Sequence, residues 1–354
     1  MQSVRGGVEG QGDMRRWLAA VFVALAASTQ AHAACKIGLV ADLPLEPDPY
    51  RALVKGAVNG RPVVFMLDTG AWASAMPYPD AKRLGIKLVP SFKFDSEGIG
   101  GRTDSMLGHF DMKLGQADLP NELVTVINMH SLDHQAVAVV GRELLGGWDL
   151  ELNLPENDVR IEKVAGCRST ELAYWNKPYS QARLEADGSS RSAILVTVLL
   201  NGRAVTAMID SGATQSIVTP GAAMSAGINL AKAEDGDEVG GIGHNHLSSK
   251  VATFSTFALG DETIKNAKLV VAEMWQYNRK EETGTRLGPM TRDSTEPRML
   301  LGADFLRAHR VLIANSMGLM VFSYVGGPVF DISQRSEKGT SGATPPSAPP
   351  AQGQ

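Results

Sequence analysis

Two stretches of the chain share one hydrophobic pattern and end in nearly the same polar sequence. The first runs through the apolar residues 63–67 into Asp68-Thr69-Gly70-Ala71. The second runs through residues 205–209, which are mostly apolar, into Asp210-Ser211-Gly212-Ala213. Short apolar runs that end at turn-forming residues are typical of buried strands. The sequence therefore predicts two buried strands that each end at an aspartate, 210 − 68 = 142 positions apart.

The features around each aspartate also recur in the same order. A hairpin turn precedes it, and a short helix, a glycine-rich tip and an apolar strand ending in glycine follow. The first copy comprises Asn59-Gly60, Pro77–Leu84, Gly98-Ile99-Gly100 and Val139-Val140-Gly141. The second comprises Asn201-Gly202, Thr219–Gly227, Gly241-Ile242-Gly243 and Leu300-Leu301-Gly302. Such a long internal repeat predicts two copies of one β-rich lobe, and hence an all-β, bilobal fold with short helices.

Composition supports this organisation, because 37 glycines, 18 prolines and 6% aromatic residues favour many short strands and turns. Five segments are expected: a leader (1–33), a first lobe (34–165), a linker (166–192), a second lobe (193–332) and a disordered tail (333–354). The spacing between copies grows before Gly302, which predicts a surface insert at Glu281–Pro297.

The N-terminus has the pattern of an export signal. Arg15 and Arg16 precede the short apolar segment Trp17–Ala27, and Ala31-His32-Ala33 offers a cleavage site, with Met14 as an alternative start. We therefore expect a periplasmic or secreted protein, with a lipoprotein anchored at Cys35 as a weaker alternative.

Two cysteines, Cys35 and Cys167, are compatible with a disulfide in an exported chain, although two free thiols stay open.

The two Asp-Thr/Ser-Gly-Ala loops resemble those of the retropepsin-like aspartic proteases, in the clan of pepsin and the retroviral enzymes. The resemblance covers about residues 50–325 and implies two lobes related by a pseudo-twofold axis. It implies a catalytic pair, Asp68 and Asp210, with Thr69 and Ser211 bonding across the axis and Gly70 and Gly212 giving the backbone room. It also implies substrate-binding flaps with tips at Gly98, Ile99 and Gly100 and at Gly241, Ile242 and Gly243.

Paired aspartates supply the chemistry that amide hydrolysis needs. When two carboxyls lie close together, double ionisation is unfavourable, so one stays protonated. The ionised carboxylate takes a proton from water while the neutral carboxyl polarises the scissile carbonyl. Ala71 and Ala213 stand where pepsin-like enzymes carry a hydroxyl that favours the ionised form. We therefore expect higher pKa values and an activity optimum between mildly acidic and near-neutral pH.

Other candidate chemistries are weaker. His130 and His134 lie four positions apart but lack a third ligand, so no metal and no cofactor is expected. A net charge of −4 without a basic cluster disfavours a nucleic-acid partner. The expected function is that of a monomeric aspartic endopeptidase acting on an envelope polypeptide. The alternatives are a catalytically silent peptide-binding module and an acid–base hydrolase of another amide or ester in the cell envelope.

Overall fold

The computed structural model describes residues 34–132, 135–175, 177–185, 193–276 and 296–330. The described residues belong to one compact unit. The predicted leader and the predicted tail lie outside the described residues, as do residues 281–295 of the predicted insert. Within the described part, no helix is long and apolar enough to cross a membrane.

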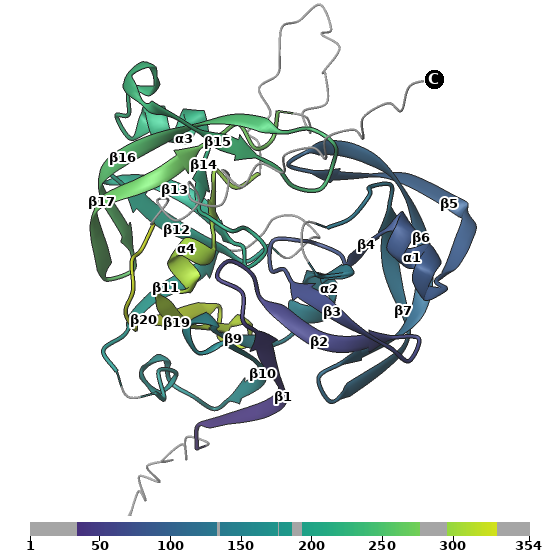
Figure 1. The fold of residues 1–354 in the computed structure, drawn as a ribbon. Coiled ribbons are helices and arrows are strands. Elements are labelled where there is room, and N and C mark those ends of the chain that lie inside the picture. The colour runs from purple at the N-terminus through teal and green to yellow at the C-terminus, as the bar shows by residue number, and fades with distance from the viewer. Residues whose placement is uncertain (1–33, 133–134, 176, 186–192, 277–295, 331–354) are drawn as a thin grey trace, which may run out of the picture. The chain divides into compact units, whose positions relative to one another are not determined.

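In the first half of the chain, six of the described strands close into a barrel (Figure 1). They are β2 (Leu53–Val58), β3 (Arg61–Leu67), β4 (Ala75–Pro77), β6 (Gly101–Leu114), β7 (Ala117–Ile127) and β8 (Ala138–Val140). Their order is β2-β3-β8-β4-β7-β6, and β6 pairs back onto β2. The hairpin strand β5 (Lys87–Gly98) and the helices α1 (Tyr78–Leu84) and α2 (Arg142–Leu145) accompany this barrel.

The second half repeats this barrel with six further described strands. They are β12 (Leu195–Leu200), β13 (Arg203–Ile209), β14 (Ile217–Val218), β16 (Leu247–Leu259), β17 (Glu262–Val271) and β18 (Met299–Leu301). Their order is β12-β13-β18-β14-β17-β16, closed by pairing of β16 with β12. The remaining elements are β15 (Glu234–Val239), α3 (Pro220–Ser225) and α4 (Ala303–Leu306).

A third sheet joins the two barrels, in the order β1-β10-β9-β19-β20-β11. Its strands are β1 (Lys36–Glu46), β9 (Asp149–Asn153), β10 (Asp158–Ala165), β11 (Ser180–Glu185), β19 (His309–Ala314) and β20 (Leu319–Tyr324). The two halves meet where β9 pairs with β19. Four 3₁₀ helices within the described residues complete the fold: η1 (Leu154–Glu156), η2 (Ser169–Glu171), η3 (Leu230–Lys232) and η4 (Asn315–Met317).

Local sequence explains why the two barrels start alike. Asn59 and Gly60 have φ values of 50° and 75°, and Asn201 and Gly202 have 48° and 78°. Both central residues of a type I′ turn need positive φ, and Asn-Gly meets this need at low steric cost. These turns set the register of β2 with β3 and of β12 with β13. Each hairpin thereby positions its second strand, which ends directly before the aspartate.

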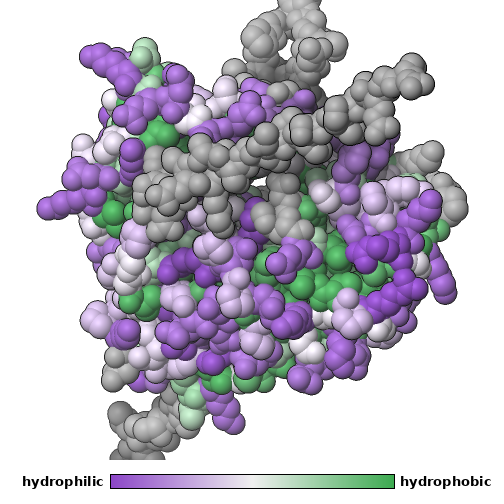
Figure 2. Space-filling model, in the orientation of Figure 1, coloured by the Kyte–Doolittle hydropathy of each residue, from purple (hydrophilic) through white to green (hydrophobic). Residues whose placement is uncertain are grey.

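The core lies inside the barrels and under the central sheet. Buried side chains from both barrels and the sheet form one continuous apolar cluster, which includes Phe65, Phe254, Phe305 and Phe322. On β3, Phe65 and Leu67 are buried, whereas Val64 and Met66, which alternate with them, are half-buried. Figure 2 shows hydrophobic side chains gathered over this part of the first barrel. Closure of the barrel thus buries one face of β3. The other face carries half-buried apolar side chains beside the aspartate loop.

The predicted all-β, bilobal fold with short helices is confirmed, but several strands were not predicted. They are β1, β5, β11, β14, β15, β16 and β17. Polar residues alternate through most of them, so no continuous apolar run marks them. The predicted linker, 166–192, contributes β11 and η2 to the fold. The boundaries proposed for the leader, lobes, linker and tail stay predictions.

Candidate active site

Each predicted catalytic aspartate comes directly after a barrel strand that pairs with a parallel neighbour. β3 pairs in parallel with β8, and the N–H of Asp68 donates to the carbonyl of Val140 at 3.0 Å. β13 pairs likewise with β18, and the N–H of Asp210 donates to the carbonyl of Leu301 at 3.0 Å. The apolar strands that end at Gly141 and Gly302 therefore fix the first residue of each loop.

The residues after the aspartates bond across the pseudo-twofold axis. The hydroxyl of Thr69 donates to the carbonyl of Ile209 at 2.8 Å and accepts the N–H of Ser211 at 3.0 Å. The hydroxyl of Ser211 donates to the carbonyl of Leu67 at 2.9 Å and accepts the N–H of Thr69 at 3.0 Å. Both side chains are fully buried. Four buried hydrogen bonds therefore tie the loops together. Each of them stabilises this arrangement, because its loss would leave a buried polar group unsatisfied.

The glycines let the carboxyls approach one another. A Cβ on Gly70 would lie 2.4 Å from Cγ of Asp210, and one on Gly212 would lie 2.3 Å from Cγ of Asp68. Real Cβ atoms do not approach other atoms so closely, so each carboxyl occupies the space that its opposite glycine leaves open. The structure therefore brings Asp68 and Asp210 together at one point.

Backbone amides hold each carboxylate within its own loop. Oδ1 of Asp68 accepts the N–H groups of Gly70 and Ala71 at 2.8 and 2.9 Å. Oδ1 of Asp210 accepts the N–H groups of Gly212 and Ala213, both at 3.0 Å. Because alanine has no side-chain donor, only its backbone amide contributes here.

Burial raises the pKa of both aspartates, against the opposing effect of these amides. The pKa of Asp210 is raised well above its usual range, because the neighbouring charge of Asp68 adds to the effect of burial. The two carboxyls also share a hydrogen bond, which lowers the pKa of Asp68 and raises that of Asp210. The arrangement therefore favours a pair of carboxyls that together hold one proton.

A second ring of polar residues supports the loops, and sequence reasoning missed it. The hydroxyl of Ser74 accepts the N–H of Gly141 at 3.1 Å, and the N–H of Ser74 donates to Glu143 at 2.7 Å. In the second lobe, the hydroxyl of Ser216 accepts the N–H of Gly302 at 3.0 Å. Its own N–H and hydroxyl donate to Asp304 at 2.9 and 2.6 Å.

A signal for this ring was available in the sequence. Ser74 and Ser216 repeat at the same offset of 142 positions as the catalytic candidates. Burial raises the pKa of Asp304 to about 6, against the lowering effect of its bonds from Ser216.

The two predicted flap tips meet each other. The N–H of Gly100 donates to the carbonyl of Ile242 at 2.8 Å, and Gly100 and Gly243 form a parallel β-bridge. The carbonyl of Gly100 accepts the backbone and side-chain N–H groups of Asn245 at 3.0 and 2.8 Å. Ile99 packs against the apolar cluster of the second lobe. Gly98 and Gly241 complete the contact, since a Cβ on either would meet the opposite isoleucine, Ile242 or Ile99.

Two cysteines and two histidines were also singled out in the sequence. Cys35 and Cys167 are joined by a disulfide bond that links the start of β1 to the end of β10. His130 is exposed, and His134 lies outside the described residues.

The fold and this site define a bilobal protein with an aspartic protease architecture. Comparison with family models agrees. Residues 54–146 match a gag-polyprotein putative aspartyl protease family, and residues 196–305 match an aspartyl protease family. No curated protein gives a match. The chain belongs to the retropepsin-like aspartic proteases and carries two such domains in tandem. Its domains support a peptidase activity.

Proposed function

We propose that the protein is an aspartic endopeptidase that hydrolyses peptide bonds with water activated between Asp68 and Asp210. The observation that carries this proposal is the set of four crossed hydrogen bonds between the loops. They bring two buried carboxyls against opposite glycines. Rigid placement of the reacting groups is the main requirement of this chemistry.

The mechanism uses one ionised and one protonated carboxyl. The carboxylate takes a proton from water as the water oxygen bonds to the scissile carbonyl carbon. The neutral carboxyl gives its proton to the carbonyl oxygen, which yields a tetrahedral diol. Breakage of the C–N bond then regenerates the carbonyl, and the leaving nitrogen takes up a proton. No covalent enzyme intermediate is required.

The surroundings of the pair favour an extended polypeptide as substrate. The flap hairpins β5–β6 and β15–β16 end in tips that meet, and an extended peptide can add to such strands. Apolar clusters lie beside both aspartate loops, one containing Ala71 and Met66, the other containing Ala213 and Ile217. We infer a preference for apolar side chains on both sides of the scissile bond.

The leader pattern and the Cys35–Cys167 disulfide support an exported location, where a polypeptide of the cell envelope would be the substrate. One chain supplies both aspartates, so a monomer is the expected active form.

The test is cleavage of a peptide library by the purified mature protein, followed by mass spectrometry. Asp68→Asn and Asp210→Asn should each abolish cleavage, whereas Asp261→Asn, which changes an exposed aspartate on the hairpin between β16 and β17, should not. Cleavage that survives either active-site substitution would refute the mechanism. Peptide binding without cleavage by the wild type would instead favour the catalytically silent module.

A further inference from the structure

A cavity of about 410 Å³ lies beside the flap hairpin of the first lobe, β5–β6. Its walls come from the start of α1, from both flap strands and from the residue that follows β7. The lining includes Tyr78, Phe94, Asp95, Asp104, Met106 and Asn128. Pockets of about 300–1,000 Å³ that combine apolar walls with a few polar groups are typical of ligand-binding sites. The proposed mechanism uses none of these residues.

The cavity lies within reach of a peptide held beneath the flap tips. Asp95 pairs with Asp104 in the β5–β6 hairpin, and this pair is three residue pairs away from the tip pair, Gly98 and Gly101. Three residues of a strand span about 10 Å. An extended peptide covers the same distance in about three residues. A long side chain a few positions from the scissile bond can therefore enter the cavity.

Hydrogen bonds between the flap and the barrel hold the walls of the cavity in place. The N–H of Asn128 donates to the carbonyl of Asp104 at 2.9 Å, and the hydroxyl of Thr103 donates to the carbonyl of Asn128 at 2.9 Å. Ser105, which is buried, donates its hydroxyl to that of Ser96 at 2.7 Å. These bonds attach β6 to the end of β7 and to β5. A pocket that is already ordered loses less conformational freedom when it binds a ligand.

Two exposed carboxylates lie directly opposite each other at this cavity, those of Asp95 and Asp104. Like charges in this position destabilise an antiparallel pair of strands. Elsewhere on the same hairpin the charges are complementary, because Arg102 forms an ion pair with its partner Glu97 at 2.9 Å. Among the side chains that the structure describes, none forms an ion pair with Asp95 or Asp104. A cation bound in the cavity would neutralise this repulsion.

The rest of the lining suits the hydrocarbon part of a long basic side chain. Tyr78 is 40% exposed, and Phe94 and Met106 are half-buried. Lysine and arginine side chains pack their methylene groups on apolar surface while the charged end contacts polar groups. Aromatic rings such as those of Tyr78 and Phe94 also attract cations. An acidic side chain would be repelled here, and an apolar one would leave the two carboxylates uncompensated.

The flap of the second lobe differs at the corresponding places. On β15 and β16, Asp235 pairs with Lys250, and the two form an ion pair at 2.7 Å. The helix α3 begins with Pro220, whereas the equivalent helix α1 begins with Tyr78. The second flap thus carries a complementary charge pair, and its helix starts without an aromatic ring.

We propose that the cavity beside β5–β6 binds a lysine or arginine side chain of the substrate polypeptide, a few residues from the scissile bond. This inference rests on the proposed endopeptidase function and adds a determinant of its specificity. Asp95 and Asp104 bind the charged end of the side chain, and Tyr78, Phe94 and Met106 contact its methylene groups. Because the second lobe differs, the preference for a basic residue is expected on one side of the scissile bond only.

The test compares arginine with citrulline, which has nearly the same shape and no charge. Peptides carry a central Phe-Leu pair and a single arginine or citrulline, placed in turn at each position two to five residues away on either side. Their binding to Asp210→Asn is measured by fluorescence anisotropy, because this variant should not cleave them. At the favoured position arginine should bind about tenfold more tightly, since each of two exposed ion pairs contributes up to about fivefold. Added salt should weaken this preference.

Variants in the same background show whether the cavity causes the preference. Asp95→Asn combined with Asp104→Asn removes both charges and preserves side-chain size, so the two peptides should bind equally. Asp118→Asn combined with Asp261→Asn is the matched control, because it removes two exposed carboxylates outside the cavity and should keep the preference. Circular dichroism verifies that each variant is folded. If the double variant fails to fold, the single variants Asp95→Asn and Asp104→Asn decide, and each should weaken the preference.

Several outcomes would overturn the proposal. They are equal binding of both peptides at every position, a preference that survives in the folded cavity variants, or calorimetric binding of Ca²⁺ that these variants lose while no preference for arginine exists. Cleavage by the wild type without any preference for basic residues would reject the proposed pocket and keep the endopeptidase. Preferred binding of arginine peptides that the wild type does not cleave would reject the endopeptidase and keep the pocket.

Discussion

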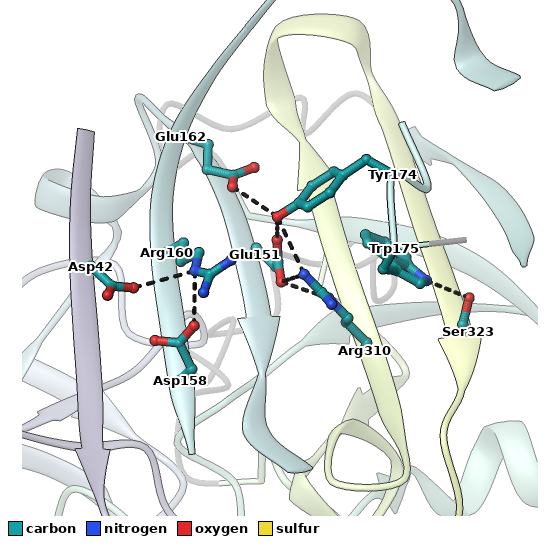
Figure 3. A network of polar contacts seen from close by, with 9 residues as sticks. All are labelled: Asp42, Glu151, Asp158, Arg160, Glu162, Tyr174, Trp175, Arg310 and Ser323. Atoms are coloured by element: carbon teal, nitrogen blue, oxygen red, sulfur yellow. Dashed lines mark hydrogen bonds and ion pairs between the residues drawn. The ribbon is translucent and has the colours of Figure 1, made fainter. Parts of the chain in front are cut away.

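Replacement of Glu162 by glutamine should remove much of the pH dependence of stability between mildly acidic and mildly alkaline pH. Glu162 on β10 and Glu151 on β9 are buried on one face of the central sheet (Figure 3), with exposed fractions of 3% and 0%. The hydroxyl of Tyr174 contacts both, Oε2 of Glu151 and, at 3.1 Å, Oε1 of Glu162. Arg310 donates to Glu151 at 2.7 Å.

Burial is the main reason why Glu162 keeps its proton, and the hydrogen bond that Tyr174 donates opposes this effect. Burial and the charge of Glu151 raise the pKa of Glu162 from 4.5 to about 7.

The linkage between protonation and folding gives the sign and the size of the change in the free energy of unfolding. Because the pKa of Glu162 is raised in the folded state, its proton is held more tightly there than in the unfolded chain. Its stabilising effect is complete below pH 4.5 and is lost as the pH rises through about 7. A shift of about 2.5 units at 1.36 kcal/mol each gives a loss of up to about 3 kcal/mol in the free energy of unfolding.

The assay is denaturant unfolding at about pH 5 and about pH 8, where the two protonation states dominate. The wild type should lose up to about 3 kcal/mol more than Glu162→Gln between these conditions, because glutamine is neutral at both. Glu156→Gln, at an exposed position, should change the difference little. An equal pH dependence in wild type and Glu162→Gln would refute the reasoning.

Three further predictions concern the site and the disulfide. Thr69→Ala should lower the free energy of unfolding by about 1–3 kcal/mol, because two buried bonds are lost; an unchanged denaturant midpoint would contradict this. Replacing Cys35 and Cys167 by serine opens a link across 132 positions and should cost about 5 kcal/mol in the chain-entropy model, measured by the same unfolding assay. The pH–rate profile should be bell-shaped, because catalysis needs one aspartate ionised and the other protonated, and both pKa values are raised. A maximum below about pH 4 would argue against the raised values.

The site could be predicted from the sequence because its parts are repeated at fixed offsets. Asp68 and Asp210, and the serine and glycine positions around them, occur twice in the same order. Their mutual contacts follow from twofold geometry: Thr69 bonds to the strand before Asp210, and Ser211 bonds to the strand before Asp68. A residue without a twin, such as Arg142, whose counterpart is Ala303, gives no such signal.

The central sheet was harder to predict because its partners are far apart in the chain. β1 pairs with β10 across more than a hundred residues, and a register shift between Leu39 and Ala41 breaks its alternation. β11 lies in a polar segment and becomes a strand by pairing with β20 and β12. Tertiary pairing, rather than local hydrophobic pattern, determines these strands.

The central sheet combines a symmetric pairing of the two lobes with a polar network that is present on one side only. Its middle pairing, β9 with β19, joins equivalent strands of the two lobes, so the sheet can carry a twofold frame. The acid network on its face is one-sided, because Tyr174 and Trp175 come from the segment that joins the lobes and pack on Arg310. Symmetric contacts thus hold the two aspartates in place, whereas the acid network is confined to one face of the central sheet.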